Sequence, residues 1–273
     1  MAYHSPTTLD EALALLGSRP MSVIAGGTDW FPANGRRPVT REMLDVTRVA
    51  ALQGIEPDGG ALRIGAAATW ADLARTSLPP AFDGLRAASR LVGGIQIQNA
   101  GTIAGNLCNA SPAADGVPPL LTLDAEIEVA GPDGARRMPL SEFTLGPRRT
   151  ALRSGEILTA IHVPAPPEGA RGAFEKAGAR AYLVISIAMT AVVARVAEGR
   201  IDHARVAVGA CGPRAVRLGA LERDMIGAAP REVRVEPRHL APLAPIEDVR
   251  ADAAYRLEAV PHQIARALAR CHG

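Results

Sequence analysis

The chain has 273 residues, which is long enough for two domains or for one large domain. Hydrophobic residues make up 48% of it and aromatic residues 3%; the formal net charge is +2, with interspersed charges that form no basic face for nucleic acid. Three cysteines without a Cys-x-x-Cys pair exclude a zinc site or iron–sulfur cluster held by cysteines of this chain. No export signal and no run of about 20 apolar residues occurs, which predicts a cytoplasmic protein without a membrane span.

The first half of the chain predicts helices and strands in close succession. Leucines at 9, 13 and 16 share one face, behind acidic residues in the first turn, which indicates an amphipathic helix over 8–16. The apolar run at 21–25 predicts a strand directly after it. The other expected elements of this half are a strand at 61–66, helices at 70–75, 82–91 and 113–123, and a strand at 126–130 that turns at 131–134.

The proline-rich segment 164–169 predicts a linker, because its residues stop both helix and sheet. Beyond it we expect three β-rich segments and two helices: strands at 174–178, 185–196 and 201–209 joined by short turns, of which 197–200 closes a hairpin, and helices at 214–225 and 251–270. The pattern predicts an α+β domain at 1–166 and a smaller domain of antiparallel sheet plus helices at 167–273.

Two consecutive glycines, Gly26 and Gly27, end the strand predicted at 21–25. Paired glycines can point successive N–H groups into one concavity, which is an anion nest suited to a diphosphate. Thr28 can add a hydroxyl donor, and we expect Asp29 to brace the loop through local bonds to the backbone. The alternative is a strand that ends in a plain glycine turn. The loop lacks the Gly-Lys-Ser/Thr of a Walker loop and the third glycine of a dinucleotide fingerprint.

The segment 95–115 is built from small residues and neutral hydrogen-bonding side chains. Gly101, Ala104 and Gly105 let a ligand approach the backbone, while donors and acceptors come from Thr102, Asn106, Ser111 and Asp115. A flat cofactor with polar edges, such as flavin, needs this combination. The alternative is a tight Gly/Asn loop packed against other backbone.

Together the two segments resemble the FAD-binding subunit of the molybdenum hydroxylases, the medium subunit of carbon monoxide dehydrogenase and xanthine dehydrogenase. The family's Ala-Gly-Gly-Thr-Asp-Leu corresponds to 25–30, and its Arg-Asn-x-Gly-Thr-Ile-Gly-Gly-Asn followed by Ala-Ser-Pro-x-x-Asp corresponds to 98–106 and 110–115. The likeness continues through 120–125, 156–164 and 174–176, and so covers nearly the whole chain. It implies a PCMH-like FAD-binding fold of two α/β subdomains, followed by the C-terminal domain.

The resemblance also implies which residues bind the cofactor. The first glycine loop would hold the FAD diphosphate, the second loop would contact the flavin, ribityl and diphosphate part, and Asp115 would accept bonds from sugar or ribityl hydroxyls. Leu158 and Lys176 align with further flavin contacts. The implied set is Val23, Ile24, Ala25, Gly26, Gly27, Thr28, Asp29, Trp30, Gly101, Thr102, Ile103, Ala104, Gly105, Asn106, Ser111, Asp115, Leu158 and Lys176. No catalytic or metal-binding residue is implied.

Several positions depart from the family pattern. Gln98 replaces the arginine beside the second loop, Ala104 replaces the first of two glycines, and Trp30 replaces a leucine. Val92 falls where some members stack an aromatic ring on adenine, and Val184 with Ile185 falls where the family shields the flavin ring. Cys108, inside the second segment, is interpreted as a small packing residue.

The resemblance implies a flavoprotein that works with partner chains. Electrons would pass from molybdopterin on a large subunit, through two [2Fe–2S] clusters on a small subunit, to FAD on this chain. NAD⁺, oxygen or another acceptor would follow, and a dimer of heterotrimers is expected. The flavin carries the redox chemistry, while the protein supplies placement and electronic tuning. The alternatives are a stand-alone FAD-dependent oxidase or dehydrogenase, and a scaffold that has lost its cofactor.

Overall fold

The N-terminal part forms a small parallel sheet in this computed structural model, which describes residues 2–272. Its strand order is β1-β3-β2, with bounds Tyr3–His4 for β1, Met21–Ile24 for β2 and Glu42–Asp45 for β3. The helix α1 (Leu9–Ser18) begins at Thr8, whose hydroxyl accepts the Glu11 N–H, and it places its leucines on the core. The short helix α2 (Trp30–Asn34) follows the glycine loop.

A five-stranded antiparallel sheet forms the middle of the molecule, in the order β4-β5-β10-β6-β7. The strands are β4 (Ile55–Asp58), β5 (Ala61–Gly65), β6 (Glu126–Gly131), β7 (Gly134–Pro139) and β10 (Ile157–Val163). The helices with this sheet are α3 (Trp70–Arg75), α4 (Asp83–Leu91), α5 (Ile95–Ala100), α6 (Ile103–Asn109), α7 (Val117–Thr122) and α8 (Leu140–Phe143). A hairpin of β8 (Thr144–Gly146) and β9 (Arg149–Thr150) follows α8.

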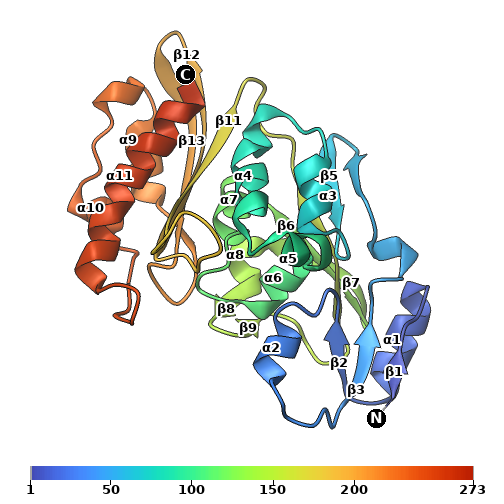
Figure 1. Cartoon of the computed structure of the whole chain (residues 1–273). Coiled ribbons are helices and arrows are strands. Elements are labelled where there is room, and N and C mark those ends of the chain that lie inside the picture. The colour runs from blue at the N-terminus through green and yellow to red at the C-terminus, as the bar shows by residue number, and fades with distance from the viewer. Residues whose placement is uncertain (1, 273) are drawn as a thin grey trace.

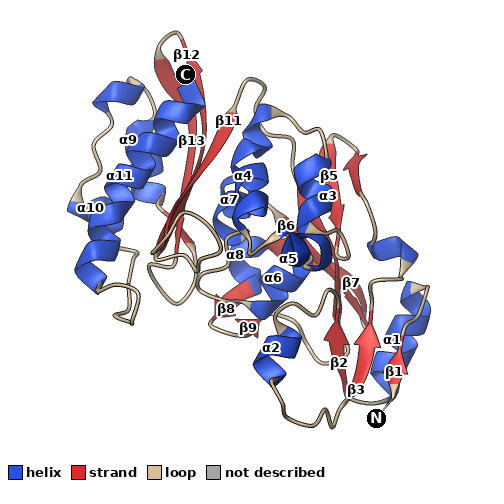
Figure 2. Ribbon diagram, viewed as in Figure 1, coloured by secondary structure: helices blue, strands red, loops and turns tan. Residues whose placement is uncertain are grey.

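The third part is a four-stranded antiparallel sheet with helices (Figures 1 and 2). Its strands are β11 (Arg171–Ala177), β12 (Ala188–Ala197), β13 (Arg200–Gly209) and β14 (Val216–Arg217), and its helices are α9 (Gly219–Met225), α10 (Pro237–Leu240) and α11 (Ala253–His272). α11 packs against β11 and β12, while α4 and α7 of the preceding part also contact this sheet. The fold is therefore the expected mixed arrangement of helices and sheets over residues 2–166, followed by an antiparallel sheet with helices.

Side chains of β11 alternate between these two layers, as the pleat of a strand requires. Ala173 belongs to the cluster with α11, and Glu175 pairs with Arg266 of that helix at 3.0 Å. Phe174 instead packs with Ala88 of α4, and Lys176 reaches the end of the same helix. β11 therefore contacts α11 with one face and α4, in the middle part of the chain, with the other.

Most expected elements are present, with four corrections. The helix expected at 113–123 begins only at Val117, because 113–116 turn first and two prolines occupy the opening of the helix. The strand expected from 185 begins at Ala188, so a long loop rather than a short turn separates it from β11. The helix expected at 214–225 is shorter, since β14 occupies 216–217. The loop expected at 101–106 is a break of two residues between α5 and α6, and the rest of it belongs to α6.

Candidate functional site

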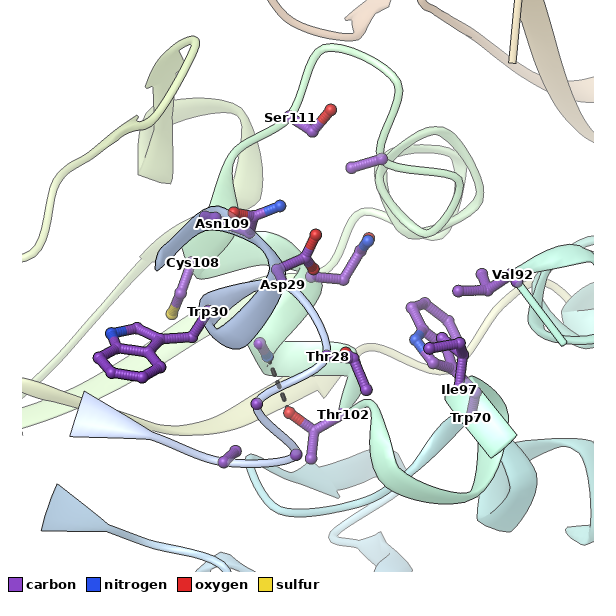
Figure 3. Close-up of a pocket in the computed structure, with 18 of the residues that line it drawn as sticks. Thr28, Asp29, Trp30, Trp70, Val92, Ile97, Thr102, Cys108, Asn109 and Ser111 are labelled. Carbon is purple, nitrogen blue, oxygen red and sulfur yellow. Dashed lines mark hydrogen bonds between the residues drawn. The ribbon is translucent and has the colours of Figure 1, made fainter. Parts of the chain in front are cut away.

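A cleft of about 920 Å³ lies where these parts meet, and its size is within the range of small-molecule sites. Residues within 23–34, 92–115 and 183–185 line it, together with Trp70 and Arg148. Both segments singled out by their glycines therefore contribute to one concave surface. Figure 3 shows Thr28 and Thr102 between Trp30 on one side and Trp70, Val92 and Ile97 on the other.

The two glycine segments touch each other at Gly26. A Cβ atom built on Gly26 would lie 1.7 Å from the carbonyl oxygen of Ala100 and 2.9 Å from the Gly101 nitrogen. Real side chains do not approach backbone so closely, so this contact requires glycine. The next residue, Gly27, has φ +67°, in the left-handed region that glycine adopts without strain. Glycine is therefore required at position 26 by a close backbone contact and at position 27 by a left-handed backbone conformation.

The second segment is held in place by a helix cap and by backbone bonds. Thr102 is the N-cap of α6, and its hydroxyl oxygen accepts the Gly105 N–H at 2.9 Å (Figure 3). Two further bonds anchor it, from Trp70 N–H to the Gly101 carbonyl (3.1 Å) and from Ile103 N–H to the Ala68 carbonyl (3.1 Å). The expected loop is therefore a break between two short helices. Ala104 lies inside α6, so the alanine that replaces the family's glycine suits its position.

Asp115 contributes a carboxylate to the cleft wall and is itself held by two neighbours. Lys176 Nζ donates to Asp115 Oδ2 at 2.7 Å, and Ser186 Oγ donates to Asp115 Oδ1 at 2.5 Å. Burial raises the pKa of Asp115, and the bonds from Lys176 and Ser186 oppose that rise. Asp115 precedes Gly116, the N-cap of α7, so it lies just outside the helix, whereas the helix expected at 113–123 would have contained it.

Asp29 and Trp30 follow the first glycine loop. Asp29 is exposed and makes no side-chain capping bond to α2, so the expected bracing of the loop by local bonds is wrong. The Asp29 carboxylate instead lies at the surface of the cleft. The Trp30 ring packs edge-on against Phe31, with ring centroids 5.0 Å apart.

The cleft brings together most of the predicted cofactor contacts. Those that line it are Val23, Ile24, Ala25, Gly26, Gly27, Thr28, Asp29, Trp30, Thr102, Gly105, Asn106, Ser111 and Asp115. The others lie behind its surface: Ile103, Ala104 and Leu158 are buried in the core, Gly101 bonds Trp70, and Lys176 lies behind Asp115. The assignment of Leu158 and Lys176 as direct contacts stays a prediction that this arrangement does not favour.

Other lining residues were outside the predicted set, although Val92, Val184 and Ile185 line the cleft where the resemblance suggested. Arg148 is the cationic side chain that lines it within residues 2–272. It occupies the turn between β8 and β9 with φ +58°, and its N–H donates to the Ala110 carbonyl at 3.0 Å. A left-handed arginine is uncommon. Sequence alone gave no signal for Arg148, because its position depends on a contact with α6.

Gln98, at the position of the missing family arginine, is buried and donates from its side-chain amide to the Arg90 carbonyl at 3.0 Å. Cys108 lies in the cleft lining, and burial raises the pKa of its thiol to about 12. A thiol with that pKa stays protonated near neutral pH, which agrees with a packing role.

The lining fits a flavin dinucleotide. The close backbone contact at Gly26 joins the two loops into one wall, and Thr28 and Ser111, which carry hydroxyl groups, line the cleft together with Asp115. The Asn106 side-chain oxygen is buried without a hydrogen-bond partner in the described structure, so this residue of the cleft lining has an unused acceptor. Within residues 2–272, no group of His, Cys, Asp and Glu is arranged to hold a metal ion, and no helix could cross a membrane.

Known proteins match the chain over most of its length. The family described as FAD binding domain in molybdopterin dehydrogenase matches residues 1–166, and the one described as CO dehydrogenase flavoprotein C-terminal domain matches 173–271. The xanthine dehydrogenase FAD-binding subunit of Escherichia coli O157:H7 is 34% identical, covering 81% of this chain and 78% of that protein. The carbon monoxide dehydrogenase medium chain of Hydrogenophaga pseudoflava is 32% identical, covering 98% and 97%.

Solved structures show the same likeness in three dimensions. Carbon monoxide dehydrogenase from Hydrogenophaga pseudoflava, in a form lacking the Mo-pyranopterin moiety of its molybdenum cofactor, has a TM-score of 0.90 at 30% identity, covering 99% of this chain and 96% of that chain. Reconstituted CO dehydrogenase from Oligotropha carboxidovorans has a TM-score of 0.91 at 29% identity, covering 99% and 97%. The family matches, the close relatives and the shared fold agree: the chain belongs to the FAD-binding medium-subunit family of the molybdenum hydroxylases, which are oxidoreductases.

Proposed function

We propose that this chain binds one FAD in the cleft and carries electrons within a molybdenum hydroxylase complex. The observation that supports it most is the contact of Gly26 with Ala100, which brings two glycine segments far apart in sequence to one cleft of about 920 Å³. Backbone N–H groups near paired glycines suit a diphosphate, and the second segment adds neutral polar groups.

The residues that would hold FAD divide by chemistry. Gly26, Gly27 and Thr28 would face the diphosphate, Asn106 and Ser111 would supply polar contacts, and Asp115 would accept bonds from hydroxyl groups. Val92, Val184 and Ile185 are apolar and would exclude water from the cleft. When bound, FAD supplies the redox chemistry, and this chain positions it and tunes its surroundings.

The partners follow from the family. We propose that a large molybdopterin-binding subunit and a small subunit with two [2Fe–2S] clusters deliver electrons to this chain, in a dimer of heterotrimers. NAD⁺, oxygen or another acceptor would receive them. The relatives named as medium chain and FAD-binding subunit support the assignment to a complex of several chains. A cytoplasmic location and a domain boundary at 166/167 are part of the same proposal.

The first test is the cofactor content of natively purified protein. We expect one FAD per chain, together with molybdenum and iron that remain through size-exclusion chromatography with two further chains. A complex free of flavin would refute FAD binding. Flavin without iron or molybdenum would instead favour the stand-alone oxidase or dehydrogenase.

A further inference from the structure

Lys176 lies behind the cleft wall rather than in it. It is the only lysine of the chain, and its side chain is 7% exposed. Its Nζ donates to Asp115 Oδ2 at 2.7 Å and to the Leu91 carbonyl oxygen at 3.2 Å. Both partners adjoin cleft residues, since Leu91 ends α4 directly before Val92 and Asp115 lines the cleft itself.

We propose that Lys176 and Ser186 are positioning residues that hold the Asp115 carboxylate toward the bound cofactor, and that Lys176 acts on FAD only through Asp115. The proposal rests on the proposed function, because it assumes that FAD occupies the cleft. It replaces the direct flavin contact that the resemblance implied for Lys176 with an indirect role.

Both carboxylate oxygens of Asp115 accept a hydrogen bond from the protein. Oδ2 accepts from Lys176 on β11, and Oδ1 accepts from Ser186 on the 178–187 loop. Ser186 directly follows Val184 and Ile185, which line the cleft. Each carboxylate oxygen has a second lone pair, so Asp115 can accept two ligand hydroxyls while it keeps both protein donors. The ion pair, the bond from Lys176 to the Leu91 carbonyl and the bond from Ser186 therefore connect three parts of the wall: 92–94, 113–115 and 183–185.

The same contacts affect the pKa of the Asp115 carboxyl group. Burial raises its pKa above the ordinary 3.8, and the nearby ammonium and hydroxyl groups counter that rise. Asp29 and Arg148 are the other charged side chains that line the cleft, and neither contributes to this shift. Without Lys176, the carboxyl group would hold its proton to higher pH and would lose part of its ability to accept hydroxyl donors.

The test is FAD titration of the full chain after flavin removal, followed by flavin fluorescence between about pH 5 and pH 8. The variants are Lys176→Met, Lys176→Arg, Ser186→Ala, Asp115→Asn and the double variant of Lys176→Met with Asp115→Asn. Glu175→Gln is the matched control, because it alters the ion pairs of the neighbouring β11 residue on the opposite face. Circular dichroism establishes that each variant is folded.

We expect Lys176→Met to raise the FAD dissociation constant at least about tenfold near neutral pH, and the wild-type and variant values to converge as the pH is lowered, because the Asp115 carboxyl group then takes up a proton in both. Ser186→Ala should change it in the same direction, Lys176→Arg should restore most of the affinity, and Glu175→Gln should match the wild type. In the Asp115→Asn background, Lys176→Met should change affinity less than about twofold.

Two results would overturn the proposal. Equal loss of affinity from Lys176→Met with and without Asp115 would mean that the lysine acts on FAD by another route. A wild-type affinity and pH profile in folded Lys176→Met would mean that it has no role in binding. Failure of the wild-type chain itself to bind FAD would refute the proposed function instead, so the two failures are distinguishable.

Discussion

Gly26 and Ala100 are in backbone contact although 73 positions separate them in the chain: a Cβ atom at position 26 would lie 1.7 Å from the Ala100 carbonyl oxygen. This contact joins the end of β2 to the break between α5 and α6. The wall of the cleft therefore depends on the absence of a side chain at position 26.

Gly26→Ala should therefore lower both stability and FAD affinity. The added methyl group meets backbone atoms, so the loops must separate, at a cost of about 1–3 kcal/mol in the free energy of unfolding. Gly17→Ala is the control, because nothing lies within 4 Å of a Cβ there and alanine is favoured in a helix. Urea denaturation and FAD titration of both variants check this. An unchanged affinity in Gly26→Ala would mean that the cofactor does not depend on this contact.

Thr102→Val should cost about 1 kcal/mol of stability, because the Gly105 N–H loses its acceptor at the start of α6. Thr8→Val removes the equivalent cap of α1, where the Thr8 hydroxyl accepts the Glu11 N–H at 3.2 Å. We expect similar losses of stability and weaker FAD binding for Thr102→Val alone. Equal FAD binding by both variants would show that Thr102 serves only as a helix cap.

Lys176→Met should destabilise the chain by about 3–5 kcal/mol at neutral pH, because the buried Asp115 carboxyl group loses its cationic partner and must either stay charged without it or take up a proton. The folded-state pKa of Asp115 is raised, so between 3.8 and that value the folded state binds more protons than the unfolded state. Stability therefore falls as pH rises through this window, and the deficit of the variant should shrink as pH is lowered. Denaturation at several pH values measures it; a deficit that grows in acid would contradict this sign.

The three thiols should react slowly in the native chain. Burial raises the pKa values of Cys108 and Cys271 to about 12 and that of Cys211 to about 11, so the reactive thiolate is scarce near pH 8. A chromogenic disulfide reagent should label all three only after denaturation, and Cys108→Ser should retain its flavin. Rapid labelling of Cys108 in folded protein would contradict the packing role.

The sequence predicted those parts of the fold whose signals are local. The 8–16 helix, the strand before Gly26 and the β12–β13 hairpin follow from periodicity, capping residues and turn residues. The helices α5 and α6 have six and seven residues, which is too short for an apolar repeat to stand out, so 101–106 was expected to be a loop. α7 begins four residues after the expected start because 113–116 form a turn, and residues 113–115 of this turn line the cleft.

The candidate site was predictable where glycines and polar side chains lie within one motif. Arg148 and Ser186 were not, because tertiary packing of a hairpin and of the 178–187 loop brings them to the cleft or to Asp115. Lys176 was expected to contact the flavin directly, and only the fold shows that its ammonium group faces Asp115. Long-range contacts of this kind leave no local sequence pattern.

The most direct test of the account is a crystal structure of the purified chain, alone or in its complex, with FAD present. We expect density for one dinucleotide in the cleft, with its diphosphate at Gly26 and Gly27 and a hydroxyl group within hydrogen-bond distance of Asp115. FAD bound elsewhere, or a cleft that contains only water at saturating FAD, would contradict the central claim.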